Sequence, residues 1–139
     1  MAPTREARIA LAEGGMAAFN EGDLPRMLAA LAEDVEVYAS PDLVNAGSYR
    51  GHDGFIRWIT AWTEAWERIS VEVTENTPVG ERHVVTAVHQ EGQGRGGIEV
   101  NMDIAFLFDV NDEGRGTFLA MLPTAEEARE MAEQREESG

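Results

Sequence analysis

The stretch Val100–Phe108, with the sequence VNMDIAFLF, decides the fold of this chain, because every even-numbered residue in it is apolar. Successive side chains of a β-strand point to opposite faces, so this alternation predicts a long strand with one buried face. We expect the even-numbered side chains to point into the domain and to leave its interior apolar, without a group that handles protons. Ala105 and Leu107 are also apolar, which favours an outer face that pairs with a second copy or another chain.

Two more strands are predicted before this stretch. Apolar residues alternate from Ile69 to Val73, and residues 83–90 are rich in β-branched side chains. Residues 77–80 predict the turn between them. The glycine-rich residues 92–97 predict a hairpin connection or a bulge before the long strand.

The C-terminal part predicts a turn, a strand and a helix. Asn111–Gly114 is typical of a hairpin turn, and residues 117–122 form a last strand. Thr124–Glu127 is a capping box that begins a short C-terminal helix. Residues 133–139 are acidic where the helix dipole favours cations, so we expect this end to fray.

The N-terminal part predicts two helices. Apolar residues recur every three or four positions at Ile9, Ala12, Met16 and Phe19. Asp23 is placed to cap a second, short helix with Pro25 in its first turn. Gly14 and Gly15 inside the first helix each cost about 1 kcal/mol relative to alanine. They indicate either close packing against another element or room left for a ligand.

A short strand and a third helix follow. Val35–Tyr38 alternates and predicts a strand, and residues 39–50 read as a loop. The clearest amphipathic helix has its apolar positions at Phe55, Ile59, Trp62 and Trp66, with Trp58 beside the same face. The order of elements predicts one α+β domain with helices on one face of a curved sheet.

Composition excludes several classes of protein. The 139 residues carry 26 acidic and 11 basic side chains, a formal net charge of −15. Such a chain repels phosphate, so we expect no nucleic-acid partner and no anionic membrane surface. The absence of cysteine excludes disulfides and thiolate chemistry. With no apolar run of about 20 residues and no signal-peptide pattern, we expect a cytoplasmic protein.

No motif in the chain specifies a cofactor or a metal. Gly92, Gly94 and Gly97 match the spacing of a dinucleotide-binding fingerprint, but they lie between two predicted strands and begin no helix. The three histidines lack metal-ligand spacing, and no Gly-x-Ser-x-Gly elbow is present. We therefore predict no metal site and no cofactor.

Several landmarks resemble one known family. They are the segments Phe19–Asp23, Tyr49–Gly54, Glu64–Glu67 and Asp112–Arg115, in this order of elements. Together they are similar to the SnoaL-like branch of the nuclear-transport-factor-2-like superfamily, from about Ala7 to Met131. The resemblance implies a single domain over residues 1–139, a cone-shaped α+β barrel. Three N-terminal helices would pack on a strongly curved mixed sheet around an apolar pocket, and a homodimer would form through the outer sheet face.

The same resemblance locates the positions where the family's enzymes carry catalytic residues. Those of ketosteroid isomerases fall at Gly15, at Ala39 or Ser40, and near Ile104, with Asp103 one residue out of register. Those of SnoaL-like cyclases fall at Phe106 and Met121. Glycine, alanine, phenylalanine and methionine cannot accept a proton, which these reactions require. The family's catalytic residues are thus largely absent.

Three functions stay open from the sequence. The first is binding of a hydrophobic small molecule in a ligand-sized apolar pocket. The pocket residues that we predict are Gly15, Met16, Tyr38, Trp58, Trp62, Ile104, Phe106 and Met121. The second is an isomerase, cyclase or hydrolase for a polyketide- or terpenoid-like substrate, with Tyr38, His89 and Asp103 as candidate catalytic residues. The third is a homodimeric protein-interaction module.

Overall fold

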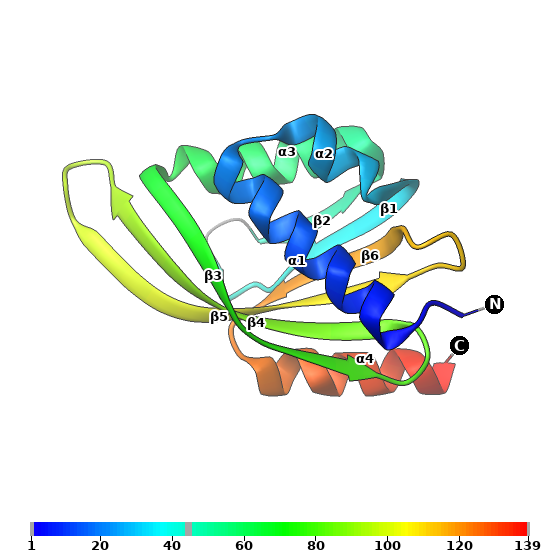
Figure 1. The fold of residues 1–139 in the computed structure, drawn as a ribbon. Helices are drawn as coiled ribbons and strands as arrows, with labels where there is room; N and C mark the ends of the chain where they lie inside the picture. Colours follow the sequence, from blue (N-terminus) through cyan, green and yellow to red (C-terminus); the bar gives the residue numbers. More distant parts are fainter. Residues whose placement is uncertain (1, 44–45, 139) are drawn as a thin grey trace.

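The chain folds into a six-stranded sheet with helices on both faces (Figure 1). The computed structural model describes residues 2–43 and 46–138. In chain order the elements are α1 (Arg5–Glu21), α2 (Leu24–Ala29), β1 (Leu31–Ala39), β2 (Gly47–Arg50), α3 (Gly51–Glu64), β3 (Trp66–Val79), β4 (His83–Gly94), β5 (Glu99–Val110), β6 (Gly116–Leu122) and α4 (Ala125–Ser138).

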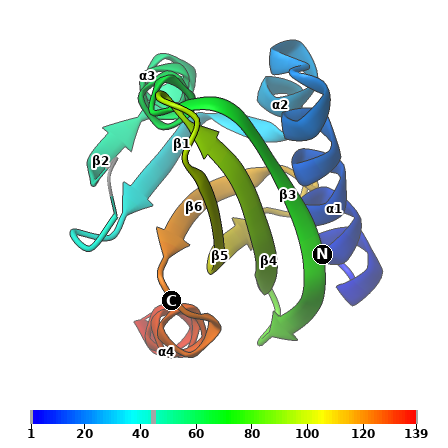
Figure 2. The ribbon, with the colours of Figure 1, turned by 90° about the vertical axis from the view of Figure 1, so that its left-hand side faces the viewer.

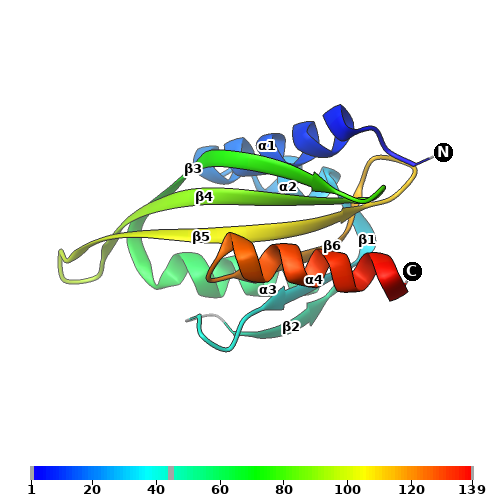
Figure 3. The ribbon, with the colours of Figure 1, turned by 90° about the horizontal axis from the view of Figure 1, so that it is seen from below.

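The sheet is mixed and strongly curved (Figure 2). Its strand order is β2-β1-β6-β5-β4-β3. The pair β1–β6 is parallel, and the other neighbouring pairs are antiparallel. Helices α1, α2 and α3 cover the inner face. Helix α4 lies on the outer face, in front of the strands when the molecule is seen from below (Figure 3). The predicted fold class is confirmed.

The alternation along β5 sorts its side chains between two apolar cores, as predicted. Ile104, Phe106 and Phe108 pack in the inner core with residues of α1, α2 and α3. Ala105 and Leu107 pack in an outer core with Ala128 and Ala132 of α4 and with residues of β6. A helix of the same chain therefore covers Ala105 and Leu107. This corrects the inference that these two residues form a surface that pairs with a second copy or another chain.

Helix ends follow the predicted capping signals. Asp23 accepts a hydrogen bond from the main-chain N–H of Arg26 at 3.2 Å and caps α2. Gly22 ends α1 with a φ of 69°, in the left-handed region that favours glycine. Thr124 accepts from the N–H of Glu127 at 3.1 Å and caps α4. These short-range bonds fix where the helices begin and end.

Three predicted boundaries are wrong. Residues 47–50 of the predicted loop form β2, which pairs with β1; residues 44 and 45 of that loop lie outside the described residues. Strand β3 continues to Val79, with Thr77 paired to Val85, so the first three residues of the predicted turn at 77–80 belong to the strand. The chain turns at residues 80–82, where Gly80 has a φ of 59°. Helix α3 ends at Glu64, so Trp66 belongs to β3.

In the described ranges 2–43 and 46–138, no helix is both long and apolar enough to cross a membrane.

Candidate functional site

An apolar cavity lies between the helices and the inner face of the sheet. It encloses about 50 Å³. Its lining residues share an apolar character and come from α1, α2, α3, β1, β5, β6 and the residue before β1: Leu11, Gly15, Met16, Phe19, Met27, Ala30, Leu31, Phe55, Trp58, Ile59, Trp62, Phe106, Phe108 and Leu119. Pockets for drug-sized ligands are about 300–1,000 Å³. The cavity is thus smaller than the ligand-sized space that the sequence predicted.

Aromatic rings take up much of this interior. The Trp62 ring stacks on Phe19 with centroids 4.6 Å apart and on Trp58 with centroids 5.5 Å apart. Trp62 also lies tilted over Phe106 at 6.0 Å. Aromatic pairs at such separations contribute about 0.5–1.5 kcal/mol beyond their buried area. The stack explains why the cavity is small, and it joins α1 and α3 to the long strand β5.

Gly15 forms part of the cavity wall without filling it. A Cβ atom placed on Gly15 would meet no atom of another described element within 4 Å, and the same holds for Gly14. Close packing against another element therefore does not explain either glycine. For Gly15 the alternative reading, open space beside the helix, agrees with its place on the wall.

The predicted pocket residues divide into three groups. Gly15, Met16, Trp58, Trp62 and Phe106 line the cavity. Ile104 and Met121 are buried in the inner core but do not line it. Tyr38 packs against the outer core, because on β1 it alternates with Val37 and pairs with Ala120 of β6. Its assignment to the pocket is therefore wrong.

His89 and Asp103, two of the three candidate catalytic residues, do contact each other. They are directly opposite in the β4–β5 register, and His89 Nδ1 lies 2.9 Å from Asp103 Oδ1. The hydrogen bond with Asp103 raises the pKa of His89 above its ordinary value. Both lie at odd-numbered positions, on the face away from the cavity, and the Asp103 side chain is 87% exposed. Tyr38, on β1, is three strands away from His89 in the sheet order.

One polar side chain of the interior was missed. Gln90 is 1% exposed, on the same face of β4 as Val84 and Val88 of the inner core. The signal was available, since residues 84, 88 and 90 share a parity on the predicted strand. An amide side chain transfers no proton, so parity is the one feature that distinguishes Gln90 in the sequence.

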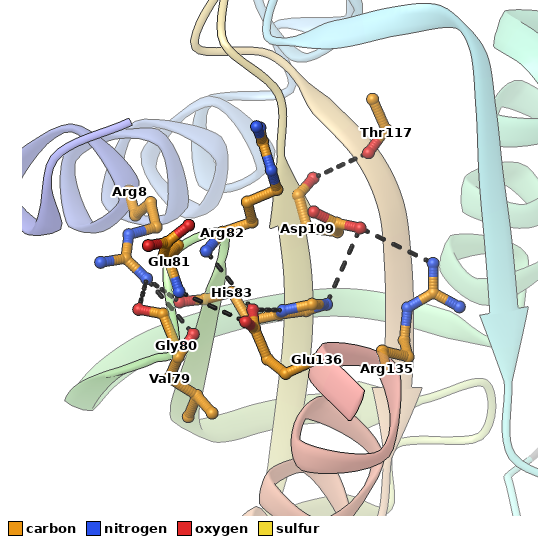
Figure 4. Close-up of polar contacts among 10 residues, drawn as sticks. All are labelled: Arg8, Val79, Gly80, Glu81, Arg82, His83, Asp109, Thr117, Arg135 and Glu136. Carbon is orange, nitrogen blue, oxygen red and sulfur yellow. Dashed lines mark hydrogen bonds and ion pairs between the residues drawn. The ribbon is translucent and has the colours of Figure 1, made fainter. Parts of the chain in front are cut away.

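A second polar cluster lies on the outer face, around His83 (Figure 4). His83 is 3% exposed, and its Nδ1 lies 2.5 Å from Oε2 of Glu136 on α4. Its Nε2 is 3.7 Å from Asp109, which also faces Arg135 at 3.7 Å. Arg8 of α1 donates to the His83 carbonyl at 2.8 Å. No local pattern predicts this cluster, because its members are far apart in the chain.

Hydrogen bonds lower the pKa of the Glu136 carboxyl. Burial acts to raise the pKa of Glu136, but hydrogen bonds from His83 and from the main-chain N–H groups of Glu81 and Arg82 outweigh it. The pKa of this carboxyl is therefore lower than usual. The cluster ties α4 and α1 to the β3–β4 turn, which is a structural role. Among the described residues, no three histidine or acidic side chains are grouped so that they could hold a metal ion.

Comparison with solved structures shows the same fold in proteins of low sequence identity. TerC, co-crystallised with polyporic acid, is 18% identical, with a TM-score of 0.76 over 91% of this chain and 98% of that chain. A Mycobacterium tuberculosis protein in complex with estradiol-17β-hemisuccinate is 17% identical, with a TM-score of 0.72 over 83% and 92%. A putative polyketide cyclase from Xanthomonas campestris pv. campestris is 23% identical, with a TM-score of 0.71 over 92% and 98%.

Comparison of sequences identifies the family. No curated protein sequence matches the chain. The family model of the SnoaL-like domain matches residues 12–117, which is most of the chain. The resemblance read from the landmarks is confirmed, and the chain belongs to the SnoaL-like domain family of the nuclear-transport-factor-2-like superfamily.

Proposed function

We propose that the protein binds a hydrophobic small molecule in the cavity between α1, α3 and β5. The observation that carries the proposal is the cavity wall, whose fourteen residues are all apolar. Transfer of apolar surface from water into such a wall is favourable by roughly 25 cal/mol per Å². Relatives of the same fold, at low identity, include complexes with polyporic acid and with a steroid derivative, which agrees with the proposal.

The ligand must enlarge the cavity as it binds, because about 50 Å³ is too small for a drug-sized molecule. Two methionines on the wall, Met16 and Met27, suit this enlargement. Methionine has three rotatable bonds and adapts to irregular shapes at low cost. The open space at Gly15 lies on the same wall.

The experiment measures binding of phenylcyclohexane, an uncharged hydrocarbon probe, by tryptophan fluorescence and thermal unfolding. Because Trp58 and Trp62 line the cavity, a saturable change in emission is expected together with a higher Tm. Gly15→Leu should weaken binding at least tenfold by filling the cavity. Gly14→Leu is the matched control, since Gly14 is adjacent in α1 but does not line the cavity. Absence of saturable binding to the wild type, or equal binding by both variants, contradicts the proposal.

We propose that the protein binds this molecule without converting it, because none of the lining residues is an acid or a base. The His89–Asp103 pair has the acid–base character of an enzyme site, but it lies on the opposite face. A molecule in the cavity therefore meets neither residue. The enzyme alternative would need a group that reaches the cavity from elsewhere.

We also propose that two copies of the chain associate through the part of the outer face that α4 does not cover. A groove there runs beside α4 and is lined by aromatic and charged side chains, including Tyr38, Phe118, Arg57 and Glu36. Side chains of both signs suit a surface that pairs with its own copy. Light scattering after size-exclusion chromatography measures the mass, and Tyr38→Arg should convert dimer to monomer. A monomeric wild type at high protein concentration contradicts this.

A further inference from the structure

The Gln90 side chain is buried and has no hydrogen-bond partner in the described part of the chain. It is 1% exposed, and neither its amide nitrogen nor its amide oxygen forms a hydrogen bond with any residue that the structure describes. An unpaired buried donor or acceptor costs roughly 1–3 kcal/mol. Such a group in a native protein calls for an explanation, and a polar contact with a molecule that the protein binds is one.

The strand register places Gln90 inside the cone. It lies opposite Val71 on β3 and Met102 on β5, both of which belong to or pack against the inner core. Met102 precedes Phe106 of the cavity wall by four residues on the same face of β5. At about 3.3 Å per residue, the Gln90 position is roughly 13 Å from Phe106 along the sheet. Gln90 thus lies at one end of the apolar interior, and the cavity lies at the other end.

Two indole N–H groups in this interior are also unpaired. The Nε1 atoms of Trp58 and Trp66 are buried and have no hydrogen-bond partner among the described residues. Trp58 lines the cavity. The Trp66 ring covers Gly92, where a Cβ would come within 2.6 Å of the ring, and Gly92 follows Gln90 by two residues on the same face. The interior therefore offers donors at both ends without acceptors for them.

Thr86 shows that a polar side chain on this face can be paired within the protein. It is fully buried on β4, four residues before Gln90, and its hydroxyl donates to Asn76 Oδ1 at 2.8 Å. The two residues share a strand, a face and a degree of burial. They differ in that Thr86 has a partner within the chain, whereas none of the residues described in 2–43 and 46–138 pairs with the Gln90 amide.

We propose that Gln90 is the polar contact of the bound molecule, a refinement that rests on the proposed function. The ligand is an elongated, uncharged hydrophobic molecule with a carbonyl or hydroxyl oxygen at one end. That oxygen accepts a hydrogen bond from Nε2 of Gln90, and a hydroxyl also donates to its Oε1. The hydrocarbon end lies in the cavity against Trp62 and Phe106. Met102 is half-buried between Gln90 and the cavity, and its flexible side chain moves aside to make room for the ligand.

The test compares two rod-shaped probes that differ by one terminal carbonyl, 4-phenylcyclohexanone and phenylcyclohexane. We expect the wild type to bind the ketone at least tenfold more tightly. Gln90→Met, and Gln90→Leu as a second apolar variant, should remove that preference, so that each variant binds the two probes with similar affinity. Both variants should also raise the Tm of the ligand-free protein, because they remove an unpaired buried amide. Thr86→Val is the matched control, and it should lower the Tm.

The outcomes separate this refinement from the proposed function. If neither probe binds the wild type, the proposed function fails and the role of Gln90 fails with it. If both probes bind but the wild type and Gln90→Met show the same ratio of affinities, the proposed function stands and Gln90 is not the polar contact. A lower Tm for both Gln90 variants means that the amide is paired within the folded protein, and it overturns the inference.

Discussion

The Asn20 side chain forms two hydrogen bonds with the main chain of Val71. Its Nδ2 donates to the Val71 carbonyl at 2.8 Å, and its Oδ1 accepts from the Val71 N–H at 2.9 Å. β3 is an edge strand, and unpaired main-chain groups on an edge are a template for unwanted pairing. Asn20, within one of the landmarks that identified the family, thus joins the end of α1 to the sheet edge.

Asn20→Ala should destabilise the protein by about 1–2 kcal/mol, because it leaves both Val71 groups without these bonds. Urea denaturation measures the loss, and hydrogen exchange at the Val71 amide should become faster. Asn20→Asp keeps the acceptor and loses the donor, so an intermediate stability is expected. Wild-type stability of Asn20→Ala would show that the two bonds contribute nothing.

Glu136→Gln should destabilise the attachment of α4. The change removes the charge that faces His83 and the N–H groups of Glu81 and Arg82. Hydrogen bonds to a charged group contribute about 1.5–3 kcal/mol, so a loss in that range is expected in chemical denaturation. The matched control is Glu133→Gln, an exposed position of α4 where a change within about 0.5 kcal/mol is expected. Equal effects of the two substitutions would contradict the role of Glu136.

The contribution of Glu136 should depend on pH in a defined direction. Its pKa in the folded protein is lower than usual, so the charged form is favoured by folding. The stabilisation is fully present above the unfolded value of about 4.3 and is lost as pH falls through the lower, folded value. The difference in unfolding free energy between the wild type and Glu136→Gln should therefore shrink as the pH falls below about 4. A difference that grows at low pH would contradict this assignment.

Asp103→Asn should lower the pKa of His89 towards its ordinary value of about 6.5. The hydrogen bond with the Asp103 carboxylate is the largest cause of the raised pKa, and an amide cannot supply its charge. NMR titration of the His89 ring protons measures the change. If the His89 pKa does not move, the contact at 2.9 Å does not persist in solution.

The alternation of side chains along the strands predicted correctly which face of the sheet most residues lie on. It placed Ile104, Phe106 and Phe108 inside and Asp103 outside, and each prediction is confirmed. The same rule would have placed Tyr38 on the outer face, since Val35 and Val37 are inside. The wrong assignment of Tyr38 followed from its aromatic character, although the strand pattern pointed the other way.

The attachment of α4 could not be read from local pattern. The acidic end of this helix predicted fraying by the dipole argument, but the helix continues to Ser138. The reason is a contact between residues 53 positions apart, in which Glu136 binds His83. The small residues Ala128 and Ala132 let the helix approach the sheet closely, and nothing in their own segment specifies the surface that they meet.

The dependence of the outer core on α4 has a consequence for biosynthesis. Strand β5 carries apolar side chains on both faces, and α4 follows it in the chain. While the polypeptide grows, Leu107 and its neighbours remain in contact with water until residues 125–138 have left the ribosome. A nascent sheet in this state is prone to aggregation. Translation that pauses after Leu122 should therefore yield chains that chaperones retain.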